Sequence, residues 1–230
     1  MGGLEAVKTS DVFPSLGIVK WVAGSVVLVA LILIVFGNLS SHQRKAQRIA
    51  ETRGLQQWGI ALNLYLIENE NQLPEVGTAP VESGQKRAWF NALPPFISEQ
   101  PLGDLPVGER PRPGVPSIWI RPGTKPVKIW DSEAFYFNYG MNTFLQPTEG
   151  ARSFRIYEIG FPGNVIFLAP TAGFVPGSSP ELLAVPKGRQ AEVPILFCDG
   201  HVQAVPAAAL LDPSALAAPT GGSGVSWFQR

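Results

Sequence analysis

The stretch that decides the fold is WVAGSVVLVALILIVFGNL, residues 21–39, which carries no charged residue. A helix needs about 20 predominantly apolar residues to cross the hydrocarbon core of a bilayer. Trp21 follows Lys20, and an amphipathic ring and a long cationic side chain both favour the headgroup level. The alternative is a helix buried in a water-soluble core. We predict a transmembrane helix over residues 18–39, preceded by an N-terminal tail over residues 1–17.

The sequence then continues without a helix breaker into an amphipathic segment. No proline lies between Pro14 and Pro74, and apolar residues recur at spacings of three, four or seven, with charged residues between them, as in a helix that packs one stripe on a partner. We therefore predict that residues 40–72 continue the helix. The residues expected to pack this helix on a globular head are Leu55, Trp58, Leu62 and Tyr65.

A second apolar set follows on the same segment. Ile60, Leu64 and Ile67 stand beside the first stripe in the helical repeat. They are expected to broaden the buried stripe, so that this half of the helix lies in the groove of a folded domain.

Residues 73–206 are expected to form that head, with residues 207–230 as a C-terminal tail that Trp227 and Phe228 pin to a surface. The chain has 22 prolines and 24 glycines, which favours long loops and short elements. We expect a short helix over 86–93 and strands over 117–120, 127–130, 135–139, 154–156, 165–168, 193–198 and 201–205. The last two flank Asp199 and Gly200, a strong hairpin signal. The predicted fold class is α+β: a long N-terminal helix packed on a small antiparallel sheet with long Pro/Gly-rich loops.

Composition and motifs argue against several function classes. The 18 basic and 18 acidic residues balance, so no nucleic-acid partner is expected. No catalytic or phosphate-binding motif is found, and we expect no enzyme activity, no cofactor and no small-molecule substrate. Cys198 lies in an apolar run and is expected to be a buried thiol.

Two groups of residues leave alternatives open. Asp199 and His201 could ligate a metal or form an acid/base pair, but Asp-Gly turn structure is the preferred interpretation, and Asn138 and Asn142 are expected to satisfy loop backbone groups. An aromatic set is expected to pack in the core, with a binding platform as the alternative. Its members are Trp89, Trp119, Trp130, Phe135, Tyr136, Phe137 and Tyr139.

Three motifs together resemble a known family. The segment from Leu55 to Pro74 is similar to the "LxxIGxALxLYxxDNxxxLP" pattern that follows the membrane helix in type II secretion pseudopilins and pilin-like relatives. Tyr139, Gly140 and Asn142 match "YGMN", and Phe197-Cys-Asp-Gly-His-Val202 matches the "FxDGHV" signature of bacterial proteins with prepilin-type N-termini. The chain departs from the family at its N-terminus, where Ile18-Val19-Lys20 follows Gly17 and the assembly glutamate is absent.

The resemblance implies a non-enzymatic structural subunit, anchored by one helix and able to assemble with copies of itself or other pilin-like subunits into a filament or secretion-type pseudopilus. Basic residues after the span (Arg44, Lys45, Arg48 and Arg53) place the head in the cytoplasm by the positive-inside rule, whereas the resemblance implies an extracytoplasmic head on a bacterial inner membrane or a cell-surface filament. The helix residues expected to contact the membrane or neighbouring helices are Trp21, Gly24, Val26, Val29, Ala30, Leu33 and Phe36. The alternatives are a monomeric membrane-anchored extracytoplasmic binding domain and a metal-dependent surface enzyme using Asp199 and His201.

Overall fold

The computed structural model describes residues 42–43, 45–124, 135–147, 152–184, 191–212 and 225–227. The chain divides into two units, residues 1–46 and 47–230. In the first unit the described residues, 42–43 and 45–46, are helical. The predicted tail and transmembrane helix lie outside the described residues. Among the described helices none is both long enough and apolar enough to cross a membrane.

The second unit begins with the longest helix of the described chain, over residues 47–68. The helix ends where the amides of Asn69 and Asn71 donate to the carbonyls of Tyr65 and Leu66. Glu70 and Asn71 then take positive φ values of 53° and 62°, which a helix cannot continue. The helix therefore ends before the expected boundary at residue 72. We call residues 47–68 the long helix.

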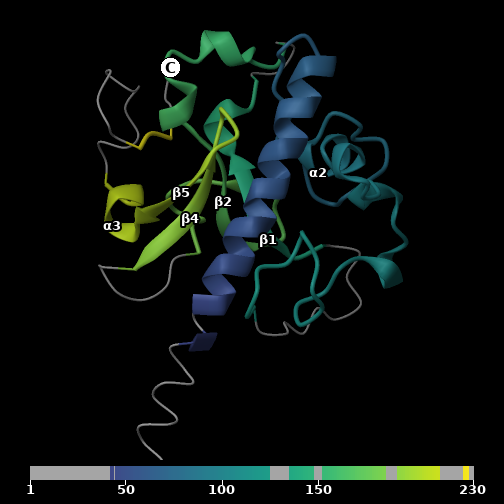
Figure 1. Ribbon diagram of the computed structural model, residues 1–230. Helices are drawn as coiled ribbons and strands as arrows, with labels where there is room; N and C mark the ends of the chain where they lie inside the picture. The colour runs from purple at the N-terminus through teal and green to yellow at the C-terminus, as the bar shows by residue number, and fades with distance from the viewer. Residues whose placement is uncertain are drawn as a thin grey trace, which may run out of the picture. The chain divides into compact units, whose positions relative to one another are not determined.

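The long helix packs on a five-stranded sheet, so the fold is α+β as predicted (Figure 1). The strand order is β3-β1-β2-β4-β5. The strands are β1 (Phe137–Asn142), β2 (Ile166–Gly173), β3 (Gly177–Ser178), β4 (Glu192–Phe197) and β5 (Val202–Pro206). The predicted strand 165–168 overlaps the first half of β2, and 135–139 overlaps β1.

The sheet is mixed, and the prediction of a purely antiparallel sheet is wrong for β3. Neighbours β1 and β2, β2 and β4, and β4 and β5 are antiparallel, but β3 runs parallel to β1. The reason is a reversal after β2, where residues 174–176 carry the chain to the far edge of β1. A strand that returns from β2 is antiparallel to β2 and must therefore run parallel to β1.

The hairpin predicted around Asp199 and Gly200 is confirmed. Leu196 pairs with Val202 and Glu192 with Pro206, and Gly200 takes a φ of 87°, which glycine adopts without a Cβ penalty. Two other predicted strands are wrong. Residues 117–120 close on themselves as a turn, and Arg155 makes a single bridge to Gln72 before a 3₁₀ turn. The predicted strand 127–130 lies outside the described residues.

The remaining elements are short, as the proline and glycine content predicts. The α-helices are α2 (Trp89–Ala92), inside the predicted 86–93 segment, and α3 (Ala207–Leu210). The 3₁₀ turns are η1 (Pro94–Ile97), η2 (Leu102–Asp104), η3 (Val107–Glu109), η4 (Thr143–Leu145), η5 (Ile156–Glu158) and η6 (Pro162–Asn164).

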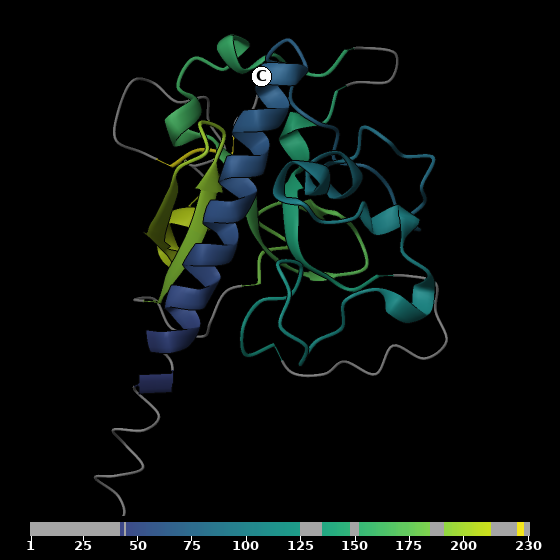
Figure 2. The same cartoon turned by 45° about the vertical axis from the view of Figure 1, so that its right-hand side comes forward.

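One face of the sheet forms the larger core with the long helix and α2 (Figure 2). Trp58 of the helix meets Trp89 edge-on at 5.4 Å between ring centroids, and Trp119 at 4.8 Å. Its indole nitrogen donates to the carbonyl of Ile118. The aromatic set predicted for the core is buried at Trp89, Trp119, Phe135, Phe137 and Tyr139, and Tyr136 is half-buried. Trp130 lies outside the described residues.

The opposite face of the sheet carries a second, smaller core. It contains Ile166, Val193, Ile195 and Leu210, with Trp227 completely buried among them. Ser226 pairs with Val165, and the indole of Trp227 donates to the carbonyl of Leu210 at 3.0 Å. The boundary expected after residue 206 thus falls inside this cluster, which contains α3 and residues 225–227.

Candidate functional site

The two faces of the long helix differ in their environment. Leu55, Trp58 and Leu62 are completely buried against the head, and Tyr65 is 5% exposed. These are the residues expected to join helix and head. The residues expected to contact the membrane or sibling helices (Trp21, Gly24, Val26, Val29, Ala30, Leu33 and Phe36) lie outside the described residues.

The outer face of the long helix carries unpartnered aliphatic side chains. Ile60 is 56% exposed, Leu64 41% and Ile67 76%, and Ile49 on the same side is 47% exposed. The expectation that this second apolar set would be buried in a groove is therefore wrong. At 3.6 residues per turn these four positions fall on one line opposite Leu62, so the head covers one side of the helix only. We call Ile49, Ile60, Leu64 and Ile67 the outer stripe.

Two of the sequence motifs meet in space. Gly59, in the helical motif, lies against the carbonyl of Gly200, in the hairpin motif, so closely that a Cβ at residue 59 would overlap that oxygen. A Cβ at Gly200 would in turn collide with the side-chain amide of Asn63. The turn of the β4–β5 hairpin therefore docks on the helix through two glycines.

Asp199 and His201 approach each other across this turn. The Nδ1 atom of His201 lies 2.6 Å from Oδ1 of Asp199, and both side chains are about two-fifths exposed, at 40% and 41%. The imidazole ring stacks on Phe197 with centroids 4.5 Å apart. The Asp199 carboxylate also accepts from the amide of His201 at 3.1 Å, which is turn structure. No group of three potential metal-ligating side chains is found among the described residues.

Asn142, the last residue of β1, holds the end of this strand through hydrogen bonds. Its amide nitrogen donates to the carbonyls of Ile166 and Trp227, at 2.9 and 2.8 Å, and its oxygen accepts from the amide of Phe144 at 3.0 Å. The residue is completely buried. As expected from the sequence, this asparagine satisfies backbone groups, and one of them belongs to a segment far along the chain.

The other motif residues have structural surroundings as well. Gly140 lies against the backbone of Gly177 and Ser178, and no side chain would fit there. Burial raises the pKa of Tyr139, with a further contribution from the nearby Glu51 carboxylate. Asn138 accepts from the hydroxyl of Thr124 at 2.6 Å.

An ion pair ties the long helix to the loop before β1. Nε of Arg121 lies 2.6 Å from Oε1 of Glu51, whose side chain is only 8% exposed. Burial raises the pKa of Glu51 and the guanidinium of Arg121 counteracts part of that rise. Arg121 also donates to the carbonyl of Ala184 at 3.2 Å.

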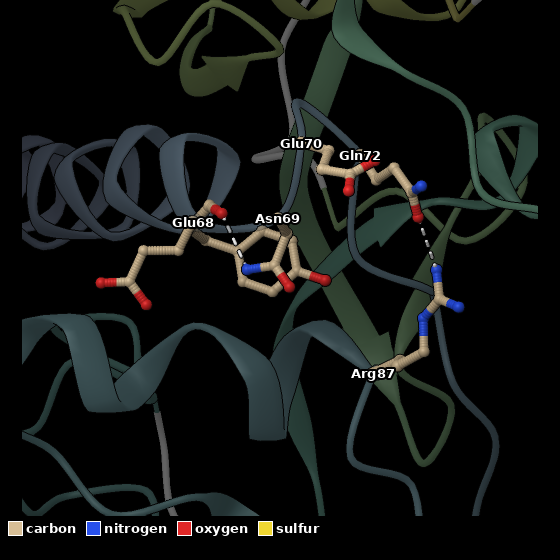
Figure 3. Close-up of a pocket in the computed structure, with 6 residues that line it drawn as sticks. Glu68, Asn69, Glu70, Gln72 and Arg87 are labelled. Carbon is tan, nitrogen blue, oxygen red and sulfur yellow. Dashed lines mark hydrogen bonds between the residues drawn. The ribbon is translucent and has the colours of Figure 1, made fainter.

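A polar pocket of about 380 Å³ opens at the C-terminal end of the long helix (Figure 3). Its lining residues are Tyr65, Glu68, Asn69, Glu70, Gln72 and Arg87. Figure 3 shows Arg87 and Gln72 facing each other on one side, with Glu68 and Asn69 on the other. The 3.2 Å hydrogen bond from Nη2 of Arg87 to Oε1 of Gln72 closes the first of these sides. We call this the helix-end pocket.

Comparisons of the chain with protein-family models, with curated proteins and with solved structures find no match. The sequence interpretation missed the outer stripe as a surface, because periodicity alone does not tell which of two apolar sets is covered. It also missed the helix-end pocket, since Arg87 is contributed by a distant loop. The helix-terminating run Glu68 to Asn71 was the only sequence signal near that pocket.

Proposed function

We propose that this chain is a pilin-like, non-enzymatic structural subunit, anchored by the apolar run at residues 21–39 and assembled with further subunits through its N-terminal helix. The observation that carries the proposal is the outer stripe. Its four aliphatic side chains form a line on a helix whose other side is buried. Three of them, Ile60, Leu64 and Ile67, lie within two turns of one another, and exposed apolar side chains that gather in this way are typical of a contact surface.

The composition of the outer face supports a helical partner of the same kind. Between the stripe residues stand Arg53, Gln56 and Gln57, which are exposed. The face thus has one charge among aliphatic and amide side chains, so two such faces can pack without bringing several like charges together. A second copy of this chain is the occupant that we propose for the stripe.

The arrangement of helix and sheet also supports the pilin-like assignment. The three motifs that carry the resemblance are not scattered over the head: Gly59 meets Gly200, and Asn142 lies in the strand that pairs with β2. Each motif contributes to packing between the helix, the β4–β5 hairpin and β1. A structural use of these motifs is consistent with a subunit and does not require a catalytic site.

The test of assembly is a charge placed in the stripe. We expect the double substitution Ile60→Glu and Ile67→Glu to abolish crosslinked oligomers and filaments in membranes. Both side chains are exposed in the subunit, and an unpaired carboxylate buried in the contact costs free energy. Crosslinking followed by electron microscopy measures the effect. Thermal unfolding of the variant should match that of the native chain.

The matched control is Val115→Glu, at a loop position that is 59% exposed. It adds a charge to an exposed apolar position outside the helix and should leave assembly intact. Oligomers that survive the stripe substitution would contradict the proposal. Release of the native chain from membranes by carbonate would contradict the anchor separately.

The second candidate function is a monomeric membrane-anchored binding domain. The helix-end pocket is the observation that favours it. In that case the chain would remain attached to membranes, crosslinking would give monomers only, and the stripe variant would behave as the native chain does.

A further inference from the structure

The hydroxyl of Tyr65 opens into the helix-end pocket without a hydrogen-bond partner among the described residues. The residue is 5% exposed and lines the pocket, and its ring packs edge-on against Phe96 with centroids 5.9 Å apart. Burial raises the pKa of this phenol above its ordinary value. The hydroxyl makes no hydrogen bond within the described chain, and it can both donate to and accept from a ligand in the pocket.

Arg87 is fixed in the pocket wall with part of its hydrogen-bonding capacity unused. Its Nε lies 3.2 Å from Oε1 of Glu75, and its Nη2 donates to Gln72 and to the hydroxyl of Ser153. The Nη1 group has no partner among the described residues. Because the oxygen of Gln72 accepts from Arg87, the amide nitrogen of Gln72 remains available as a second donor.

The opposite wall offers acceptors. The carboxylate of Glu68 has no partner within the described chain. Asn69 uses its amide nitrogen on the carbonyl of Tyr65 at 2.8 Å and keeps its oxygen free. Glu70 is held by Arg155, whose Nη2 lies 3.1 Å from Oε2. This leaves the second oxygen of Glu70 unused.

The free donors of Arg87 and Gln72 and the free oxygen of Asn69 therefore line one cavity together with Tyr65, whereas the carboxylate of Glu68 points away from Arg87 and Gln72 (Figure 3). Two further charges of the lining are compensated inside the protein. Arg87 is paired with Glu75 and Glu70 with Arg155. A hydroxyl both donates and accepts, so a neutral ligand that carries several hydroxyls matches such a lining better than an ion does. The volume of about 380 Å³ falls within the range of small-molecule sites, about 300–1,000 Å³.

From these contacts we propose that the helix-end pocket binds a neutral polyhydroxylated ligand of the saccharide class. Tyr65 gives and receives a hydrogen bond, Arg87 and Gln72 donate, and Asn69 accepts. The inference does not depend on assembly through the outer stripe. A monomeric and an assembled chain would both carry this site.

The rival chemistry is a small ammonium ion. The C-terminal end of a helix carries partial negative charge, and Glu68 stands there unpaired. The experiment must therefore separate hydroxyls from positive charge, which one panel of probes can do.

The binding test uses the full-length chain in phospholipid nanodiscs prepared without glycoside detergent. Saturation-transfer NMR is recorded with methyl glucoside, methyl galactoside, methyl mannoside and N-acetylglucosamine, and with cadaverine as the ammonium probe. The proposal expects transfer to at least one neutral sugar at millimolar concentration. Transfer to cadaverine alone, or to no probe, would overturn it.

Tyr65→Phe is the decisive variant. It removes the hydroxyl and keeps the ring on Phe96, so we expect the affinity for the responding sugar to fall roughly 2- to 12-fold, the loss of one hydrogen bond. The melting temperature should stay unchanged, since the hydroxyl makes no hydrogen bond within the described chain and the ring keeps its packing on Phe96. Unchanged affinity would place the sugar elsewhere and overturn the assignment.

A matched pair of glutamine positions provides the control. Gln72→Ala should weaken sugar binding by a similar factor, whereas Gln100→Ala, at an exposed position outside the pocket lining, should leave it unchanged. Equal effects of the two substitutions would show a non-specific response and contradict the site. Loss of membrane attachment or of oligomers bears on the proposed function and is recorded separately on the same samples.

Discussion

Gly59 in the long helix lies directly against the backbone carbonyl of Gly200 in the β4–β5 turn, with no space for a side chain between them. The methyl group of Gly59→Ala would push the turn away from the helix. We expect a loss of about 1–3 kcal/mol in the free energy of unfolding, the usual cost of overpacking. Urea unfolding followed by circular dichroism measures it.

Gly54 provides the control on the same helix, since a Cβ there meets nothing within 4 Å. Gly54→Ala should stabilise the protein by roughly 0.5–1 kcal/mol, because alanine is the better helix former. Equal changes at residues 54 and 59 would show that the turn can move aside at no cost.

Asn142→Ala tests the clamp between β1, β2 and the segment containing Trp227. The carbonyl of Trp227 would lose its donor, and that of Ile166 would keep only the weak contact with the Cys198 thiol, at a cost of about 1–3 kcal/mol for an unsatisfied group. Hydrogen exchange at residues 225–227 should accelerate more than exchange in β5. The exposed Asn63→Ala is the comparison, and similar losses for both would argue against a special role of residue 142.

We predict that the free energy of unfolding depends on pH through Glu51. Burial raises its pKa in the folded state above the unfolded value near 4.5, so its favourable contribution is complete below pH 4.5 and is lost as the pH rises through the folded pKa. Glu51→Gln resembles the protonated form. The variant should be at least as stable as the native chain at neutral pH, and its advantage should shrink on acidification.

The measurement is urea unfolding of the native chain and of Glu51→Gln at several pH values between about 4 and 8. Carboxylates with raised pKa values titrate in this range. A stability difference that grows toward acid pH would contradict the sign derived from burial. Such a result would mean that the attraction of Arg121 outweighs the cost of desolvation.

Cys198 should be unreactive in the folded protein. Its thiol is completely buried, contacts the carbonyl of Ile166, and has a pKa raised well above the usual range by burial and by Asp199. The thiolate is the reactive species. We expect no labelling by maleimide until the protein unfolds, measured by mass spectrometry, whereas Val115→Cys should supply a rapidly labelled site.

The parts of the fold that follow from local chemistry could be predicted from the sequence. The Asp199-Gly200 turn specifies its hairpin, because the turn needs a positive φ and apolar residues flank it on both sides. The stripe of Leu55, Trp58 and Leu62 gives the buried face of the helix. The clustering of Trp58, Trp89 and Trp119 also agrees with a core role, since large aromatics dominate cores.

The parts of the fold that depend on contacts between residues distant in sequence could not be predicted. The two residues of β3 have no strand pattern and pair only because the chain reverses beyond Gly173. The exposure of Ile60, Leu64 and Ile67 depends on how far the head extends around the helix. The spacing of apolar residues in the sequence does not indicate that extent. The helix-end pocket needs Arg87, and nothing in the sequence near the helix indicates its approach.

Trp227 has a consequence for the order of folding. Its backbone carbonyl accepts a hydrogen bond from Asn142, a residue separated from it by 85 positions. Its indole completes the smaller core. Contacts over such separations form late, since the loop between them must first be closed. During synthesis the helix and the larger core can assemble as soon as β5 is available. The second face of the sheet stays exposed to solvent, or to a chaperone, until residue 227 arrives.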